Sequence, residues 1–246
     1  MNHKILEAWE YVKLVNLTEE NIKHDLPLST TFGDTGMGDF GFIYETDEAI
    51  VIAFRGSDDQ DDWISNLRVK PNEVEWHSGF YRSAKHHFKT IENFLLSSKG
   101  LQSKQIRLQG HSRGGALALT VAKFISDNYI NLRGKIDVIT FGCPKVATER
   151  ASLKEDIEKG FIKHITVVNG LDIVPRVPPE FPWRKGDYKR YCNKLIHIGY
   201  KPTWWEKIKL LYYYFKQKEN VKLKWITDHN TENYERSILQ QNWKEV

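Results

Sequence analysis

Residues 105–124 read QIRLQGHSRGGALALTVAKF. The first five residues mix polar and apolar side chains in a way that predicts a short strand, and the small apolar residues from Gly114 onward favour a buried helix. Between the two lies a match to the G-x-S-x-G pattern of a nucleophile elbow, a sharp turn that holds a serine between a strand and a helix. We therefore expect a nucleophilic serine, Ser112, in an elbow formed with Gly110, His111 and Gly114.

The segments on both sides of this elbow alternate between strand and helix patterns. Strands are expected at residues 42–46, 49–54, 135–141 and 162–168. Helices are expected at residues 5–15, 18–24, 80–96 and 148–159. Such alternation is typical of a mostly parallel central sheet flanked by helices, and with a nucleophile elbow it predicts the α/β-hydrolase fold. The length of 246 residues fits one large domain, so we expect a single domain over residues 1–246.

The glycine-rich stretch at residues 33–41 contains a second pattern, because Gly36, Gly38 and Gly41 spell G-x-G-x-x-G. A dinucleotide site needs a strand before this motif and a helix N-terminus after it, to hold the pyrophosphate. Here the pattern of a strand follows the motif. We therefore interpret the stretch as a turn and expect no nucleotide cofactor.

Composition narrows the class of protein further. The longest apolar runs are far shorter than the roughly 20 residues that cross a bilayer, and the first residues lack the apolar core of a signal peptide. Two cysteines, Cys143 and Cys192, are too few for a disulfide scaffold and favour reduced thiols, although a single bridge is the alternative. We expect a cytoplasmic protein, with peripheral membrane association or non-classical export as alternatives.

A serine nucleophile needs a general base and an acid that orients it, which follow in the chain order serine, acid, histidine. Three histidines come after Ser112. His164 and His197 lie in strand-like segments, whereas His229 lies in a polar stretch that predicts a loop able to reach the site. We favour His229 as the base, and His197 is the alternative.

The acid is expected just beyond the end of a strand. Asp172 has this position, before a proline, whereas Asp137 falls inside a predicted strand. Asp156 and Glu158 fall on a polar helix, where a solvated carboxylate is the ordinary case. Asp228, the neighbour of the favoured histidine, is a further alternative. We favour Asp172.

Five segments, in order, resemble motifs of the class 3 lipases, a family of α/β-hydrolases that includes small fungal triacylglycerol lipases. The segments are FRGS at 54–57 with DWISNL at 62–67, HSGF at 77–80, GHSRGGA at 110–116, TFGCPKV at 140–146 and NGLDIVP at 169–175. They cover the chain from about Gly41 to Pro179. Arg113 departs from the family pattern, in which this position is usually apolar.

The resemblance implies roles for particular residues. Ser112 is the nucleophile, Asp172 the orienting acid and His229 the base. The oxyanion hole consists of Ser57 and the backbone N–H of Arg113. We expect that no metal or organic cofactor is required.

A lid over the site is also implied by the resemblance, at residues 57–67. Its Trp63, Ile64 and Leu67 would pack over an acyl chain. The aspartates between them make the segment more acidic than a lid that seeks lipid.

We expect a serine hydrolase that cleaves carboxylic esters of lipids through an acyl-enzyme, as triacylglycerol lipases do. A phospholipase or lysophospholipase of the same fold is the alternative within the enzyme class. A non-catalytic lipid-binding module with the same fold is the alternative outside it. We expect no nucleic-acid partner, because no nucleic-acid-binding motif is present.

A basic, aromatic insertion is expected near residues 176–224, which carry 13 basic and 4 acidic side chains, or +9, against +4 for the whole chain. Within it, Thr203 and Glu206 form a capping box that predicts the start of a helix. The apolar stripe of this helix is Trp204, Trp205, Ile208, Leu211 and Phe215. We expect the stripe to pack on the sheet, as most amphipathic helices do. Contact with a membrane or lipid-droplet surface is the alternative.

Overall fold

The computed structural model describes residues 2–17, 19–26, 29–34, 39–56, 71–178, 187–206, 208–209, 212, 227–240 and 244–245. Its framework is an eight-stranded sheet, in the order β1-β2-β3-β4-β5-β7-β9-β10. The strands are β1 (Thr30–Asp34), β2 (Asp39–Glu45), β3 (Ala49–Phe54), β4 (Gln105–His111), β5 (Ile136–Phe141), β7 (Ile162–Asn169), β9 (Lys194–Ile198) and β10 (Lys244–Glu245). Strands β3 to β9 run parallel, and the pairs at the two edges are antiparallel.

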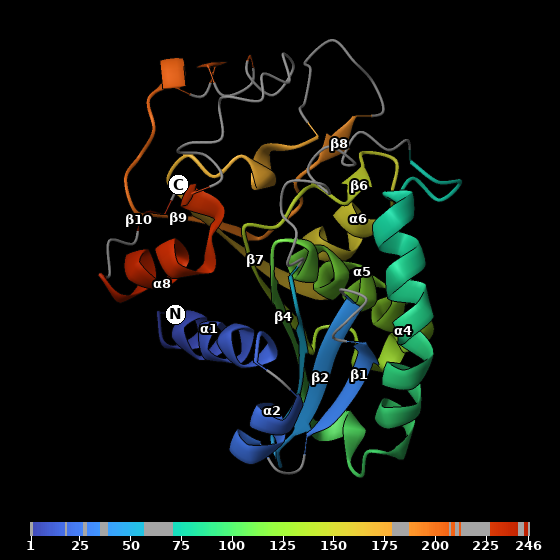
Figure 1. Ribbon diagram of the computed structural model, residues 1–246. Helices are drawn as coiled ribbons and strands as arrows, with labels where there is room; N and C mark the ends of the chain where they lie inside the picture. Colours follow the sequence, from blue (N-terminus) through green and yellow to red (C-terminus); the bar gives the residue numbers. More distant parts are fainter. Residues whose placement is uncertain are drawn as a thin grey trace.

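Helices cover both faces of this sheet (Figure 1). One face carries α4 (Ser78–Ser97), α5 (Arg113–Asn128) and α6 (Leu153–Glu158). The opposite face carries α1 (Asn2–Val15), α2 (Glu19–Asp25) and α8 (Thr231–Leu239). This three-layer arrangement confirms the predicted α/β-hydrolase fold, with a mostly parallel sheet between helices.

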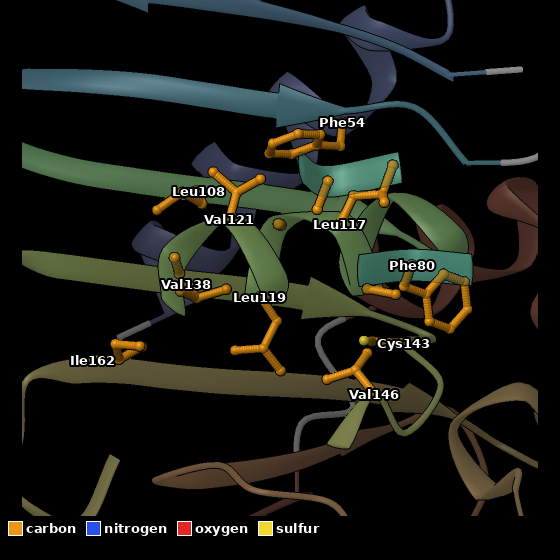
Figure 2. Packing of buried hydrophobic residues seen from close by; sticks show 14 of the residues in the cluster. Phe54, Phe80, Leu108, Leu117, Leu119, Val121, Val138, Cys143, Val146 and Ile162 are labelled. Atoms are coloured by element: carbon orange, nitrogen blue, oxygen red, sulfur yellow. The ribbon is translucent and has the colours of Figure 1, made fainter. Parts of the chain in front are cut away.

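The centre of the sheet is apolar on both sides. All six residues of β3, the sequence AIVIAF, are buried, as expected for a parallel strand with helices on both faces. Figure 2 shows Leu117 and Val121 of α5 pointing toward Phe54 of β3 and Leu108 of β4. Each such side chain contributes about 2 kcal/mol through its removal from water. The core therefore fixes α5 against the strand that precedes it.

The two ends of the described chain meet on the other face of the sheet. Trp9 of α1 stacks on Tyr234 of α8, with ring centroids 5.9 Å apart, and contacts Phe141 at the end of β5. Lys13 and Glu235 form an ion pair at 3.1 Å between the same two helices. In Figure 1, blue α1 and red α8 lie beside each other. Helix α8 is thus fixed by contacts with the first helix of the chain.

The glycine-rich stretch differs from the prediction. Part of it forms strands, since β1 includes Gly33 and β2 begins at Asp39. A side chain on Gly41 would overlap the Phe32 ring, so glycine allows Phe32 to lie across β2 and contact Phe54. The prediction of a turn was therefore wrong for these residues, and residues 35–38 lie outside the described part. The last glycine of the motif, Gly41, lies within strand β2, where a dinucleotide site would need the N-terminus of a helix.

The polar helix expected at residues 148–159 is shorter in the structure. Helix α6 has only six residues, Leu153–Glu158. Ala147 and Thr148 instead form β6, which pairs with β8 (Tyr188–Lys189). The Thr148 hydroxyl also donates to Glu75 Oε2 at 2.8 Å. These partners are distant in sequence, so no local pattern indicates them.

The helix predicted after Pro202 begins as expected. Thr203 N and Oγ1 donate to Glu206 Oε2 at 2.7 and 2.9 Å, and Glu206 N donates back to Thr203 Oγ1 at 3.3 Å. Trp204 and Trp205, however, are 65% and 66% exposed. The expectation that this stripe packs on the sheet is therefore wrong for its described residues. Leu211 and Phe215 lie outside the described part. No helix in the described ranges combines the length and apolar character needed to cross a bilayer.

The ring of His164 in β7 is buried and contacts Thr140 of β5 and the backbone of Tyr191. Its Nδ1 lies 2.6 Å from the Tyr191 carbonyl oxygen and its Nε2 lies 2.9 Å from Thr140 Oγ1. Burial lowers the pKa of His164 from 6.5 to about 4, against the raising effect of the hydrogen bond to the carbonyl. The pKa of His164 is thus lower in the folded protein than in the unfolded chain. Its contribution to the free energy of unfolding is therefore complete above about pH 6.5 and is lost as the pH falls toward 4.

We predict that His164 alone removes about 2 kcal/mol from the free energy of unfolding between about pH 7 and about pH 5. Urea unfolding at both pH values measures this loss. The loss should be smaller in His164→Gln, which has no group to protonate. His24→Gln, an exposed change on α2, should lose as much as the unsubstituted protein. Equal losses in all three proteins would contradict the role given to His164.

Candidate active site

The turn between β4 and α5 holds Ser112 in a rare backbone conformation, with φ 57° and ψ −126°. A residue with a side chain adopts such angles at a cost of about 1–3 kcal/mol, so the surroundings must enforce them. The serine N–H donates to the Phe141 carbonyl oxygen at 2.8 Å, which ties the turn to the end of β5. Ser112 is fully buried and directly precedes α5.

Two glycines make this turn sterically possible. A side chain on Gly110 would overlap the backbone of Gly114 and Gly115. A side chain on Gly114 would overlap the carbonyl group of Phe54 in the neighbouring strand. The two glycines of the elbow pattern therefore allow β4, β3 and α5 to approach one another closely.

The ring of His229 contacts the Ser112 hydroxyl. Its Nε2 lies 2.8 Å from Ser112 Oγ, and its Nδ1 lies 2.8 Å from Asp172 Oδ2. Since an ionised carboxylate only accepts hydrogen bonds, Nδ1 carries the proton and Nε2 accepts from the serine. His229 is fully buried at the end of the 3₁₀ helix η4 (Thr227–His229), rather than in the polar loop expected from sequence.

Asp172 follows the end of β7 and is fully buried. Its Oδ1 accepts from the Val174 N–H at 2.9 Å, and its Oδ2 accepts from His229 Nδ1. The Arg176 side chain also binds this turn, because its Nε donates to the Asp172 carbonyl oxygen at 3.1 Å. The turn is thereby fixed at both the backbone and the side chain of Asp172.

Tyr234 is a residue of this site that sequence reasoning missed. Its hydroxyl donates to Asp172 Oδ2 at 2.6 Å, on the oxygen that also binds His229. Burial, followed by the nearby Asp172 charge, raises the pKa of Tyr234 well above 10, so the hydroxyl keeps its proton. Only the spacing of five residues from His229 connects Tyr234 with the site in the sequence.

His111 of the elbow stacks on the ring of His229, with centroids 4.6 Å apart and planes at 30°. Burial, followed by the neighbouring His229, lowers the pKa of His111 well below 6.5. The ring of His111 is therefore neutral at neutral pH. A protonated His229 ring would therefore not be repelled by a positive charge on the His111 ring.

Gly142, directly after β5, passes close to two of these side chains. A Cβ at this position would lie 2.9 Å from both Asp172 Oδ2 and His229 Nδ1, and the backbone has φ +59°. Only glycine can adopt this backbone conformation and also fit in the small space beside these side chains. Gly142 was not singled out as a site residue, although the TFG motif contains it.

The residues considered as alternatives in the sequence analysis have other partners than Ser112. His164 binds Thr140 and Tyr191, as described above, and His197 lies in β9 beside β10. Asp228 Oδ2 accepts from the Leu171 N–H at 2.7 Å, so this carboxylate holds the turn after β7. The structure therefore brings together Ser112 and the two residues favoured for it.

The remaining predicted site residues divide into two groups. Arg113 begins α5, so its backbone N–H belongs to the helix N-terminus beside the serine. Ser57 and the expected lid residues Trp63, Ile64 and Leu67 lie outside the described residues. Within the described ranges, no group of three or more His, Cys, Asp or Glu side chains is arranged to hold a metal ion.

The profile of the class 3 lipase family matches residues 51–181, which is more than half of the 246 residues. The chain belongs to the class 3 lipase family. Within this family it is 29% identical over 147 residues to a lipase of Rhizomucor miehei, an alignment that covers 55% of this chain and 39% of that protein. It is 30% identical over 166 residues to phospholipase A1-Igamma2 of Arabidopsis thaliana, a chloroplastic protein, covering 54% of this chain and 31% of the relative.

Solved structures show a similar fold. The Rhizomucor miehei lipase in its complex with the propeptide has a TM-score of 0.64 at 20% identity, with 80% of this chain and 69% of that chain covered. The chain therefore shares the fold of the fungal protein. The chain spans about a third to two fifths of the length of the two curated relatives named above.

We predict that Gly142→Ala displaces the His229 ring, because the new methyl group would lie 2.9 Å from His229 Nδ1. The buried proton between His229 Nδ1 and Asp172 Oδ2 should give a far-downfield NMR signal, and this signal should vanish in Gly142→Ala. Gly160→Ala is the matched control, because Gly160 also has a positive φ (+71°) but a Cβ there would have nothing within 4 Å. The control should keep the signal. A signal retained in both variants would contradict the steric argument.

Proposed function

We propose that this protein is a serine hydrolase that cleaves carboxylic esters of lipids, as a triacylglycerol lipase does. The observation that carries the proposal is the hydrogen-bonded series of Ser112 Oγ, His229 Nε2, His229 Nδ1 and Asp172 Oδ2, with 2.8 Å at both contacts. Membership of the class 3 lipase family supports the same chemistry. So does the likeness to a lipase and to a phospholipase A1.

In the proposed reaction, Ser112 Oγ attacks the carbonyl carbon of the ester while its proton passes to His229 Nε2. The Asp172 carboxylate stabilises the imidazolium that forms. His229 then gives this proton to the departing alcohol, which leaves an acyl group on Ser112. A water molecule, deprotonated by His229, releases the fatty acid and restores the serine.

The negative charge on the ester oxygen needs hydrogen-bond donors in the transition state. We assign one donor to the backbone N–H of Arg113, at the N-terminus of α5, where the helix dipole also favours negative charge. The family resemblance supplies Ser57 as the second donor. The neutral ring of His111 supports the same step, because it adds no positive charge beside the imidazolium of His229.

Phospholipid is the second candidate substrate. Arg113 stands directly after the nucleophile and is partly exposed, and a guanidinium is a residue group that binds phosphate-bearing head groups. The likeness to phospholipase A1-Igamma2 supports this candidate. Release of fatty acid from phosphatidylcholine and from a triacylglycerol, measured side by side, distinguishes the two substrates.

We also propose that residues 1–246 work as one unit, because the first and last helices of the described chain pack on each other through Trp9 and Tyr234. A lid that contains Trp63, Ile64 and Leu67 is proposed on the family resemblance alone. A cytoplasmic location stays a prediction from sequence.

We predict that Ser112→Ala and His229→Ala lower kcat/KM for p-nitrophenyl esters by about 10⁴-fold or more, because each removes a group that reacts. His197→Ala should retain most of the activity, since His197 lies in β9 and not beside the serine. Esters of short and long acyl chains, assayed with all four proteins, provide the measurement.

The same assay decides between an enzyme and a binding module. A folded unsubstituted protein that hydrolyses none of the esters and does not react with serine-directed phosphonates would contradict the proposed function. A non-catalytic lipid-binding module would then take its place. An active His229→Ala together with an inactive His197→Ala would instead reassign the base.

We predict that Tyr234→Phe lowers kcat about tenfold and leaves KM almost unchanged, because Asp172 loses a donor and positions His229 less well. Tyr129→Phe is the matched control, since its hydroxyl donates to Glu92 at 3.0 Å far from the serine. Steady-state kinetics of both variants provide the comparison. If both variants lose kcat equally, or neither does, Tyr234 has no positioning role.

A further inference from the structure

Apolar side chains are gathered at the surface just after β9. Trp204, Trp205 and Tyr212 are 65%, 66% and 53% exposed, and Ile208 is 36% exposed. We call these four residues the aromatic face. The two indole rings contact each other edge to face, with centroids 4.8 Å apart. An exposed group of large apolar side chains of this kind marks an interaction site more often than a single exposed residue does.

Helical geometry places the four side chains in one direction. Residues 204–206, 208–209 and 212 are helical, and the capping box of Thr203 and Glu206 fixes where the helix begins. At 100° per residue, positions 204, 205, 208 and 212 fall within an arc of roughly 100°. The aromatic face is therefore one continuous stripe.

The aromatic face is joined to the turns that hold the active site. Tyr200 and Asp228 both approach Gly170, where a Cβ would lie 2.8 Å from Tyr200 Cε1 and 2.6 Å from Asp228 Oδ2. Gly170 begins the turn that carries Asp172. In Figure 1, the orange segment that follows β9 rises beyond the end of the sheet. Pro202, which is buried, holds the start of this segment.

Charge indicates what the aromatic face contacts. Lys201 and Lys209, at the borders of the stripe, are exposed. The wider segment of residues 176–224 carries +9, whereas the whole chain carries +4. Tryptophan and tyrosine side chains prefer the boundary between lipid head groups and acyl chains, and lysines beside them attract anionic lipids.

We propose that the aromatic face is a docking surface for an anionic phospholipid bilayer. Only the role of this surface rests on the proposed function: docking would hold the Ser112 site beside a lipid surface. The binding itself does not depend on catalysis. Binding requires insertion of Trp204 and Trp205 at head-group depth, with Lys201 and Lys209 near the lipid phosphates. Binding should therefore weaken with salt and with removal of anionic lipid.

The test is co-sedimentation of the full chain with vesicles of phosphatidylcholine, with and without phosphatidylglycerol. The chain carries Ser112→Ala, so that hydrolysis does not change the lipid and binding is measured independently of catalysis. The variant Trp204→Ser with Trp205→Ser should bind the anionic vesicles about tenfold or more weakly. Circular dichroism and thermal unfolding check that the variant is folded.

The matched control is Leu96→Ser with Ile130→Ser, which removes two apolar side chains that are 65% and 71% exposed elsewhere on the surface. The control should bind like the parent. Equal binding by the tryptophan variant and its parent would overturn the proposal. So would equal binding to vesicles with and without phosphatidylglycerol. A dimer in sedimentation velocity that the tryptophan change abolishes, without vesicle binding, would assign the face to a second copy instead.

Discussion

The close approach of β3, β4 and α5 at the elbow is the constraint on which the rest of the site depends. Ser112 keeps its backbone at φ 57° and ψ −126° only because Gly110 and Gly114 have no side chains to separate these elements. The apolar packing of α5 on the sheet supplies the free energy that holds the strained turn in place. The strain of one residue is thus balanced by burial along a whole helix.

The parallel sheet then brings the partners of Ser112 to the same edge. Ser112 follows β4, Gly142 follows β5 and Asp172 follows β7, and carboxyl ends of parallel strands lie together. Each turn is held by a bond to a neighbour, such as Ser112 N–H to the Phe141 carbonyl oxygen. His229 enters from a different direction, on η4, and its place depends on the packing of α8 against α1.

How much of this site the sequence predicts depends on how local the determining interactions are. The elbow is determined within a few residues, because a strand, a strained turn and a helix follow each other, so its prediction from sequence was possible. Asp172 was favoured by its position after a strand, and in the structure its Oδ2 lies 2.8 Å from His229 Nδ1. Tyr234 gave no such signal, because its partner Asp172 is 62 residues away and they meet only through the fold.

Which way the apolar side of a helix faces is harder to predict from sequence than the periodicity of the helix. The stripe that includes Trp204 and Trp205 shows that a helix is amphipathic, and the capping box shows where it starts. Neither pattern says whether the apolar side faces the sheet or the surroundings, and the usual outcome, burial, was expected. The strand β1 was missed for a related reason, since Gly33 and Gly41 favour turns locally, whereas pairing with β2 and the Phe32 contact are tertiary.

Burial of Asp172 explains why the site needs more than three residues. Removal of a carboxylate from water costs several kcal/mol unless hydrogen bonds replace the lost hydration. Here the Val174 N–H, His229 Nδ1 and the Tyr234 hydroxyl supply donors, and the last two share Oδ2. A hydroxyl that keeps its proton binds the carboxylate without neutralising it. In the proposed reaction the charge of Asp172 thus stays available to His229 when this ring accepts a proton, and Tyr234 acts on this step through Asp172 alone.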